Sequence, residues 1–165
     1  MRISRLLFTT TLLTLLGGYS LVAQAADGAI KVTSIAEVEV VTVGKDGNKT
    51  VKRGSPEKAV PGTEVIFTNK FENVSNKAAS DIVINNPIPN ATAYKAGSAF
   101  GKDAIVVFSA DGGKTFDTAD KLKIKGADGR QRNAAPGEYT HIRWTYKGQL
   151  QPGKSGEVGF QAVIK

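Results

Sequence analysis

Apolar side chains recur at every second position in three parts of this chain. They alternate with polar or small residues over residues 65–71, 140–146 and 157–164. A period of two is typical of half-buried antiparallel strands, whereas a helix repeats its apolar face about every 3.6 residues. No stretch shows a convincing helical period. The pattern therefore predicts an all-β chain.

Shorter runs of β-forming residues predict further strands, separated by turn pairs such as Pro61-Gly62 and Pro152-Gly153. These further strands are expected at residues 30–43, 49–52, 80–85, 104–109 and 122–124. Seven to nine short strands in about 140 residues suit an antiparallel two-layer sandwich of immunoglobulin type. A closed barrel is the alternative that strand spacing alone leaves open.

The first twenty-five residues have the pattern of an export signal. Arg2 and Arg5 precede an apolar stretch over residues 6–16, and Ala23-Gln24-Ala25 matches the small-x-small cleavage motif. The alternative is an uncleaved membrane anchor, but residues 6–23 are marginal for the roughly 20 apolar residues that cross a bilayer. We therefore expect residues 1–25 to be a signal peptide, cleaved after Ala25, with no transmembrane segment left afterwards.

The chain contains no cysteine, which excludes disulfides, thiol chemistry and a lipid-modified cysteine anchor. We expect an exported protein in the periplasm, at the cell surface or outside the cell. The net charge of the whole chain is +7, and cleavage would remove two arginines and leave about +5. Such an excess favours solubility and weak attraction to anionic surfaces. No motif for specific nucleic-acid binding accompanies it.

A family resemblance covers residues 59–165. The segments that carry it are 61–67 (PGTEVIF), 81–89 (DIVINNPIP), 97–99 (GSA), 109–116 (SADGGKTF) and 150–158 (LQPGKSGEV). Together they resemble the bacterial domain of unknown function eleven, also called the conserved-repeat domain. The resemblance implies an immunoglobulin-like sandwich domain over 59–165, and residues 26–58 would then form an N-terminal strand and hairpin that lead into it.

One residue departs from the usual pattern of that family. Asn69 stands where an apolar residue is common. A buried amide needs hydrogen-bond partners or costs a few kcal/mol. We therefore expect a bulge or a strand edge at Asn69.

A second motif lies within the family-like region. Ser109, Asp111, Gly113, Thr115 and Phe116 resemble the Asp-box hairpin of sialidase propellers. The aspartate is expected to accept backbone N–H groups of the turn while the paired glycines take positive φ. Thr115 should re-enter a strand, and Phe116 should pack beneath the turn. One copy cannot form a propeller, so the motif predicts a structural hairpin and not sialidase activity.

The sequence presents little catalytic or metal-binding chemistry. Asp111, Asp117 and Asp120 are close together, but their spacing does not match an EF-hand loop, so no metal or cofactor is expected. His141 is the only histidine and should point outward beside Arg143. A single solvated histidine cannot supply a catalytic triad or a multi-histidine metal site. We therefore expect no enzyme activity and assign no catalytic residue.

The segment Ile30–Val43 supports two interpretations. It is either the first strand of the sandwich or a strand whose exposed N-terminal part leaves its own domain and pairs with the edge of a neighbouring copy. The residues of this possible assembly strand are Ile30, Val32, Ile35, Val38 and Val40.

Two classes of function follow from the sequence. The favoured one is a non-enzymatic structural or adhesive protein of the bacterial envelope or extracellular matrix, which acts through protein partners or self-association. The alternative is a periplasmic or secreted binding protein that holds a ligand with two end loops, residues 86–95 and 125–138. Fold alone does not decide between them.

Overall fold

The structure is a computed structural model, and it describes residues 22–24, 29–43 and 47–165. The predicted signal peptide lies outside the described residues apart from positions 22–24. All pairings between the described strands are antiparallel. The chain is thus an all-β protein, as its apolar pattern predicts.

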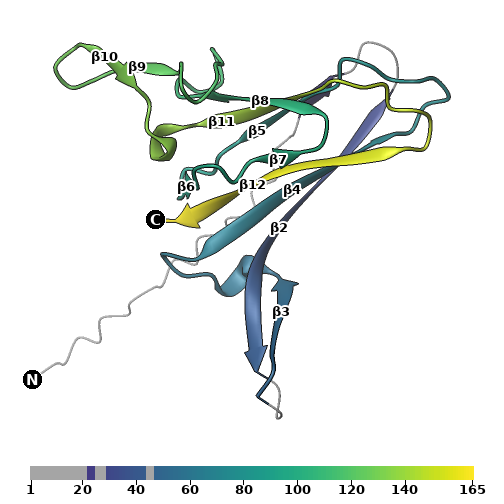
Figure 1. The fold of residues 1–165 in the computed structure, drawn as a ribbon, viewed down its shortest axis with the longest axis horizontal. Coiled ribbons are helices and arrows are strands. Elements are labelled where there is room, and N and C mark those ends of the chain that lie inside the picture. The colour runs from purple at the N-terminus through teal and green to yellow at the C-terminus, as the bar shows by residue number, and fades with distance from the viewer. Residues whose placement is uncertain (1–21, 25–28, 44–46) are drawn as a thin grey trace, which may run out of the picture.

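The described strands form two main sheets, which are the two layers in Figure 1. The first sheet has the order β1 (Val22–Gln24), β5 (Val83–Pro87), β11 (His141–Tyr146) and β8 (Ala104–Ser109). The second has the order β3 (Lys49–Gly54), β2 (Ile30–Val43), β4 (Glu64–Asn73), β12 (Ser155–Ile164) and β6 (Thr92–Tyr94), with β7 (Phe100–Gly101) also on β12. Among the described strands, each sheet has two end strands that do not pair with each other, so neither sheet closes. The sandwich is therefore confirmed and the closed barrel is wrong.

Smaller elements complete the described chain. A separate two-stranded sheet joins β9 (Lys123–Lys125) to β10 (Gln131–Asn133), and two short 3-10 helices cover Pro56–Lys58 (η1) and Pro136–Glu138 (η2). The structure thus divides its described residues into twelve strands, more than the seven to nine expected. The excess comes mainly from strands of two or three residues, which are too short to show an alternating pattern.

The core lies between the two main sheets. Its fully buried side chains include Ile142 and Trp144 from β11, Phe71 from β4, and Val158 and Phe160 from β12. These are apolar positions of the alternating runs. The period of two is confirmed in β11, whereas in β4 the alternate positions Ile66 and Thr68 are buried as well. Complete burial of such side chains stabilises the fold by roughly 1.5–3 kcal/mol each.

Asn69 contradicts the expectation of a bulge or an edge. It lies in the middle of β4, opposite Ser34 of β2 on one side and Val158 of β12 on the other, in unbroken register. The residue is 1% exposed. Ser34 Oγ donates a hydrogen bond of 2.8 Å to Asn69 Oδ1, while Asn69 Nδ2 has no partner in the described part of the chain. Continuous pairing on both sides holds the amide in the interior, with its oxygen hydrogen-bonded and its nitrogen without a partner among the described residues.

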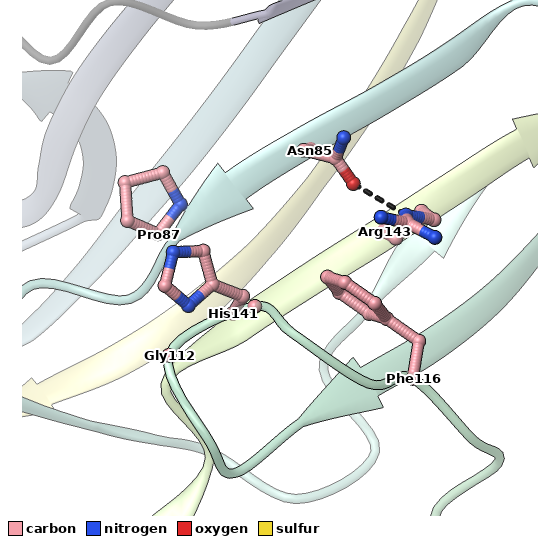
Figure 2. Close-up of a pocket in the computed structure, with 7 residues that line it drawn as sticks. Asn85, Pro87, Gly112, Phe116, His141 and Arg143 are labelled. Atoms are coloured by element: carbon pink, nitrogen blue, oxygen red, sulfur yellow. Dashed lines mark hydrogen bonds between the residues drawn. The ribbon is translucent and has the colours of Figure 1, made fainter.

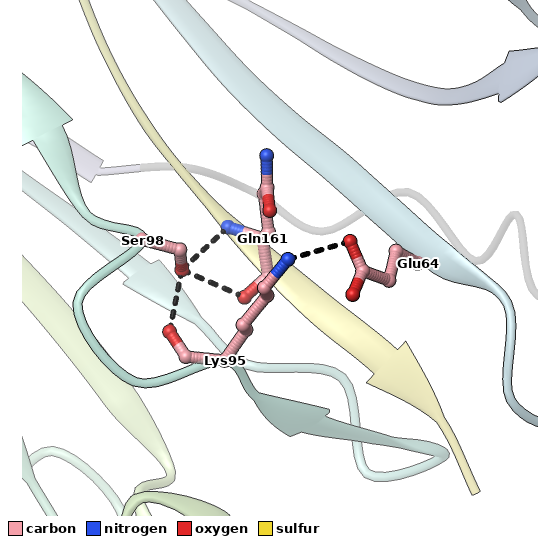
Figure 3. Close-up of polar contacts among 4 residues, drawn as sticks. All are labelled: Glu64, Lys95, Ser98 and Gln161. Atoms are coloured by element: carbon pink, nitrogen blue, oxygen red, sulfur yellow. Dashed lines mark hydrogen bonds and ion pairs between the residues drawn. The ribbon is translucent and has the colours of Figure 1, made fainter.

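A serine hydroxyl ties the β6–β7 loop to β12 (Figure 3). β12 pairs with β6 at residues 162–164 and with β7 at residues 158–159, which leaves Gln161 between the two pairings. Gln161 N donates to Ser98 Oγ at 3.0 Å, and Lys95 N donates to Gln161 O at 2.9 Å. Lys95 Nζ also pairs with Glu64 Oε2 at 2.7 Å. The loop therefore supplies hydrogen-bond partners to the backbone of β12 at Gln161, between its pairings with β6 and β7.

Phe100 covers the outer face of the same strand at Gly159. A Cβ atom on Gly159 would lie 2.4 Å from Phe100 Cζ and 2.3 Å from the backbone oxygen of Phe67. Such distances are far below van der Waals contact, so β12 needs a glycine here.

The strand β1 comes from the predicted signal peptide. Its residues Val22, Ala23 and Gln24 lie opposite Asn85, Ile84 and Val83 of β5. This pairing makes β1 the end strand of the first sheet, and β1 also lies alongside β2 of the second sheet.

Candidate functional site

The Asp-box-like hairpin follows β8 directly. Ser109 is fully buried at the end of the strand, and its Oγ donates to Asp111 Oδ1 at 2.7 Å and accepts from Gly113 N at 2.9 Å. Thr115 Oγ1 donates to Asp111 Oδ2 at 2.6 Å, and the N–H groups of Lys114 and Thr115 donate to Oδ1, each at 3.0 Å. The expected role of the aspartate, accepting N–H groups of the turn, is therefore confirmed.

These hydrogen bonds stabilise the charged form of the carboxylate. The Thr115 hydroxyl, followed by the Thr115 N–H and the Ser109 hydroxyl, holds the pKa of Asp111 well below its usual range. Gly112 and Gly113 have φ values of 77° and 83°, which confirms the predicted left-handed backbone. The Asp111 carboxylate is thus ionised at neutral pH, and both of its oxygens accept hydrogen bonds from groups of the hairpin.

The end of the hairpin differs from the expectation. Thr115 does not re-enter a strand, and only an isolated bridge between Phe108 and Asp117 follows. Phe116 is half-buried, and its ring lies under the guanidinium of Arg143, with Arg143 Cζ 3.6 Å from the ring centroid. The sequence did not predict this cation–π contact.

A shallow hollow lies beside this hairpin on the outer face of the first sheet (Figure 2). Its lining residues come from β5, the hairpin and β11: Asn85, Pro87, Gly112, Gly113, Phe116, His141 and Arg143. Arg143 Nε donates to Asn85 Oδ1 at 2.5 Å, which holds the guanidinium between Phe116 and β5. The hollow therefore presents a fixed positive charge beside an aromatic ring.

His141 lies on the outer face of the sheet beside Arg143, as predicted, but in the hollow it is partly buried and not fully solvated. Its ring packs against Gly113, where a Cβ atom would lie 3.2 Å from His141 Cδ2, and its Nδ1 lies 3.2 Å from Thr140 Oγ1. Partial burial lowers the pKa of His141, while the Asp111 carboxylate has a smaller raising effect. The imidazole is thus mostly neutral at pH 7. Among the described residues that line the hollow there is no carboxylate, thiol or hydroxyl that this imidazole could activate.

The two end loops of the binding hypothesis do not converge on the hollow. Pro87, from residues 86–95, is part of its lining, but no side chain of residues 125–138 is. In that second loop, Arg132 makes two hydrogen bonds to the Glu138 carboxylate, at 2.6 and 2.7 Å. The pair lowers the pKa of Glu138 to about 2. The guanidinium of Arg132 is thus paired with a carboxylate of its own loop.

The three aspartates considered for calcium are not gathered into a site. In the described ranges no three acidic or histidine side chains lie close enough to hold a metal ion. The Asp111 carboxylate accepts hydrogen bonds within the hairpin, and the backbone of Asp117 is hydrogen-bonded to that of Phe108.

The residues of the possible assembly strand differ in burial and in the strands with which they pair. Ile30, Val32 and Val38 belong to the part of β2 that pairs with β4, and all three are at least half-buried. Ile35 lies in the same stretch but is 49% exposed. Val40 lies beyond the sandwich, where β2 pairs only with β3. The N-terminal part of Ile30–Val43 is therefore a regular strand of its own sheet, and the part that leaves the sandwich is the C-terminal one.

We call this projecting hairpin the arm, and we define it as residues 39–43 of β2 together with β3, Lys49–Gly54 (Figure 1). Val41 lies directly opposite Val51. The exposed fractions of the arm valines are 46% for Val40, 56% for Val41, 63% for Val43 and 57% for Val51. The sequence pattern did not predict Val41, Val43 or Val51 as residues of a site. The adjacent valines at 40 and 41 were the available signal, because neighbouring strand residues face opposite sides and cannot both face one core.

Comparison with models of known protein families, with curated proteins and with solved structures found no match. Membership of the conserved-repeat family therefore stays a prediction from residues 59–165. In the described part of the chain, no helix has the length and apolar character needed to cross a membrane.

Proposed function

We propose that this chain is an exported, non-enzymatic structural or adhesive protein of the bacterial envelope or extracellular matrix. It acts through protein contacts, including addition of strands between copies. In this proposal residues 1–25 are a cleaved signal peptide, and residues 59–165 are an immunoglobulin-like conserved-repeat domain.

The observation that carries the proposal is the arm. It projects from the sandwich, it carries four exposed valines, and β3 forms the end of its sheet, so its outer backbone edge has no neighbouring strand among the described residues. Two-stranded ribbons are marginally stable in water by themselves. Burial of the exposed half of a valine side chain contributes roughly 1 kcal/mol, so a partner that covers the arm gains several kcal/mol.

The chemistry of the hollow also supports a non-enzymatic role. Its imidazole is mostly neutral and has only the Thr140 hydroxyl as a hydrogen-bond neighbour in the described chain. General base catalysis needs a substrate or nucleophile proton within reach of the base and an orienting group behind it. Neither the lining of the hollow nor the Asp-box-like hairpin supplies such a set.

Cell fractionation tests this proposal when arm variants are compared with a matched control. The arm variant replaces Val41 and Val51 by threonine, which keeps strand propensity and removes apolar surface. The control replaces Val60 and Val74, which are 62% and 54% exposed but lie outside the arm. The wild type and the control should sediment with envelope or fibrous material, whereas the arm variant should become soluble. Wild-type protein found entirely free in the periplasm would contradict the proposal.

The hollow favours one alternative, a secreted or periplasmic binding protein. The guanidinium of Arg143, fixed by Asn85 and Phe116, suits a ligand with a carboxylate or another small anion. Two-dimensional NMR with acetate and with short peptides tests this role. Shifts that saturate in the wild type and vanish in Arg143→Gln support it, and unchanged spectra in both proteins exclude it.

A further inference from the structure

Removal of the signal peptide would also remove a strand of the sandwich. The predicted cleavage site follows Ala25, and β1 occupies Val22–Gln24 immediately before it. β5 has β11 on one side and β1 on the other. After cleavage, the side of β5 that faced β1 is therefore a free sheet edge, which we call the acceptor edge.

The acceptor edge lacks the usual protection of natural sheet edges. Natural edge strands carry charged side chains, prolines or bulges that prevent pairing with other chains. Val83, Ile84 and Asn85, the residues that β1 covers, include neither a charge nor a proline. Pro87 limits pairing only at the far end of β5. The opposite edge of this sheet, β8, is partly covered by the bridge between Phe108 and Asp117.

Loss of β1 would also remove a neighbour of the second sheet, because β1 lies alongside β2. A strand that replaced β1 would restore backbone hydrogen bonds to β5. This is the arrangement in which a chain completes the sandwich of its neighbour.

The strand that follows the predicted cleavage site is already engaged in its own sheet. Only residues 26–29 precede β2, and β2 is engaged with β4 from Ile30 to Val38. Among the described end strands, β3 of the arm projects from the sandwich, and its six residues are long enough to cover the three positions vacated by β1. β3 carries Lys49, Lys52 and Arg53, so pairing of two β3 strands would bring like charges together, whereas the acceptor edge is uncharged.

We propose that cleavage after Ala25 exposes the acceptor edge of β5 and that the arm strand β3 of a second copy of this chain adds to it. This rests on the proposed function and names its partner. Donor and acceptor are different surfaces, so the contact is head-to-tail and can continue from copy to copy as a fibre or close as a ring. In the uncleaved chain β1 blocks the edge, which delays assembly until export.

Light scattering during size exclusion tests the proposal with two forms of the chain. One form spans residues 26–165, and the other spans residues 22–165 and keeps β1. The mass of the first should rise with concentration to two or more times that of one chain, while the second should stay at the mass of one chain. Equal masses for both forms at every concentration would overturn the proposal.

Substitutions in the arm identify the donor. Val51→Lys in the 26–165 form should return it to the mass of one chain, because it replaces the exposed apolar side chain of the donor strand by a fourth basic one. Val74→Lys, at an exposed valine outside the arm, should assemble like the unmodified form. Fluorescence of the buried Trp144 shows that each variant is folded. Assembly that persists in Val51→Lys would overturn β3 as the donor.

Two measurements test the proposed strand addition separately from the proposed structural role. The mass of the protein isolated after export shows whether residues 1–25 are removed, and retention of residues 22–25 contradicts the proposed processing. A cleaved protein that stays monomeric in solution but sediments with the envelope through its arm leaves the structural role intact and overturns strand addition between copies.

Discussion

Gly159→Ala should destabilise the sandwich strongly. The added Cβ would lie 2.3 Å from the backbone oxygen of Phe67 and 2.4 Å from Phe100 Cζ. Phe100 can swing away because it is partly exposed, but Phe67 lies in β4, which is paired on both sides and cannot shift alone. Overpacking of this kind costs about 1–3 kcal/mol, and a fixed backbone neighbour places Gly159→Ala at the upper end of that range.

Gly54→Ala is the matched control for this substitution. The nearest atom to a Cβ at Gly54 is Val40 Cγ2 at 3.7 Å, which is ordinary van der Waals contact. Alanine is favoured over glycine within a strand by roughly 0.5–1 kcal/mol, so Gly54→Ala should leave stability unchanged or slightly increased. Urea unfolding followed by Trp144 fluorescence measures the free energy of unfolding of both variants.

A third variant separates the two clashes. In a Phe100→Ala background the contact with the ring is absent and the contact with Phe67 remains. Gly159→Ala should therefore cost less in that background than in the wild type, by a coupling of about 0.5–3 kcal/mol, but its cost should not disappear. Equal costs in both backgrounds, or an unperturbed Gly159→Ala protein, would refute the reasoning.

Three further substitutions test hydrogen bonds. Ser98→Ala should lower the free energy of unfolding by about 1–3 kcal/mol because Gln161 N loses its acceptor, and urea unfolding measures this against Ser98→Thr, which keeps the hydroxyl. Ser109→Ala should cost a similar amount, since it leaves Gly113 N without its acceptor, and amide exchange at Gly113 should accelerate. Glu138→Gln should destabilise the protein above pH 4.5, because the folded-state pKa of Glu138 is lowered from 4.5 to about 2. The stability difference from wild type should vanish as the pH falls towards 2, and a pH-independent difference would contradict the ion pair.

The longer strands of the fold are readable from the sequence because their side chains alternate. Ile30–Val43 and Ala104–Ser109 match the predicted ranges. The short strands β6 and β7 were not predicted, since two or three residues carry no period, and their pairing depends on the distant strand β12. Asn69 was misjudged because its polarity suggested an edge, while the pairing of its neighbours places it in the interior.

The candidate site was only partly predictable. The turn formed by Ser109 and Asp111 depends on local spacing, and it is confirmed. The contact of Phe116 with Arg143 joins segments far apart in the sequence, which a linear pattern does not reveal. The arm is not predicted as a projecting element, because the adjacent valines at 40 and 41 show only that both cannot face one core, and not that the strand leaves the sandwich.

Hydrogen–deuterium exchange of the 26–165 chain, dilute and concentrated, tests the central claim most directly. The claim is that the arm makes the protein contacts of this chain. The account predicts that backbone amides of β3, Lys49–Gly54, exchange at least tenfold more slowly in the concentrated sample, while those of β8, Ala104–Ser109, are unchanged. Exchange in β3 that is equally fast at all concentrations, in a sample whose mass has grown, would show that assembly uses another surface and would contradict the account.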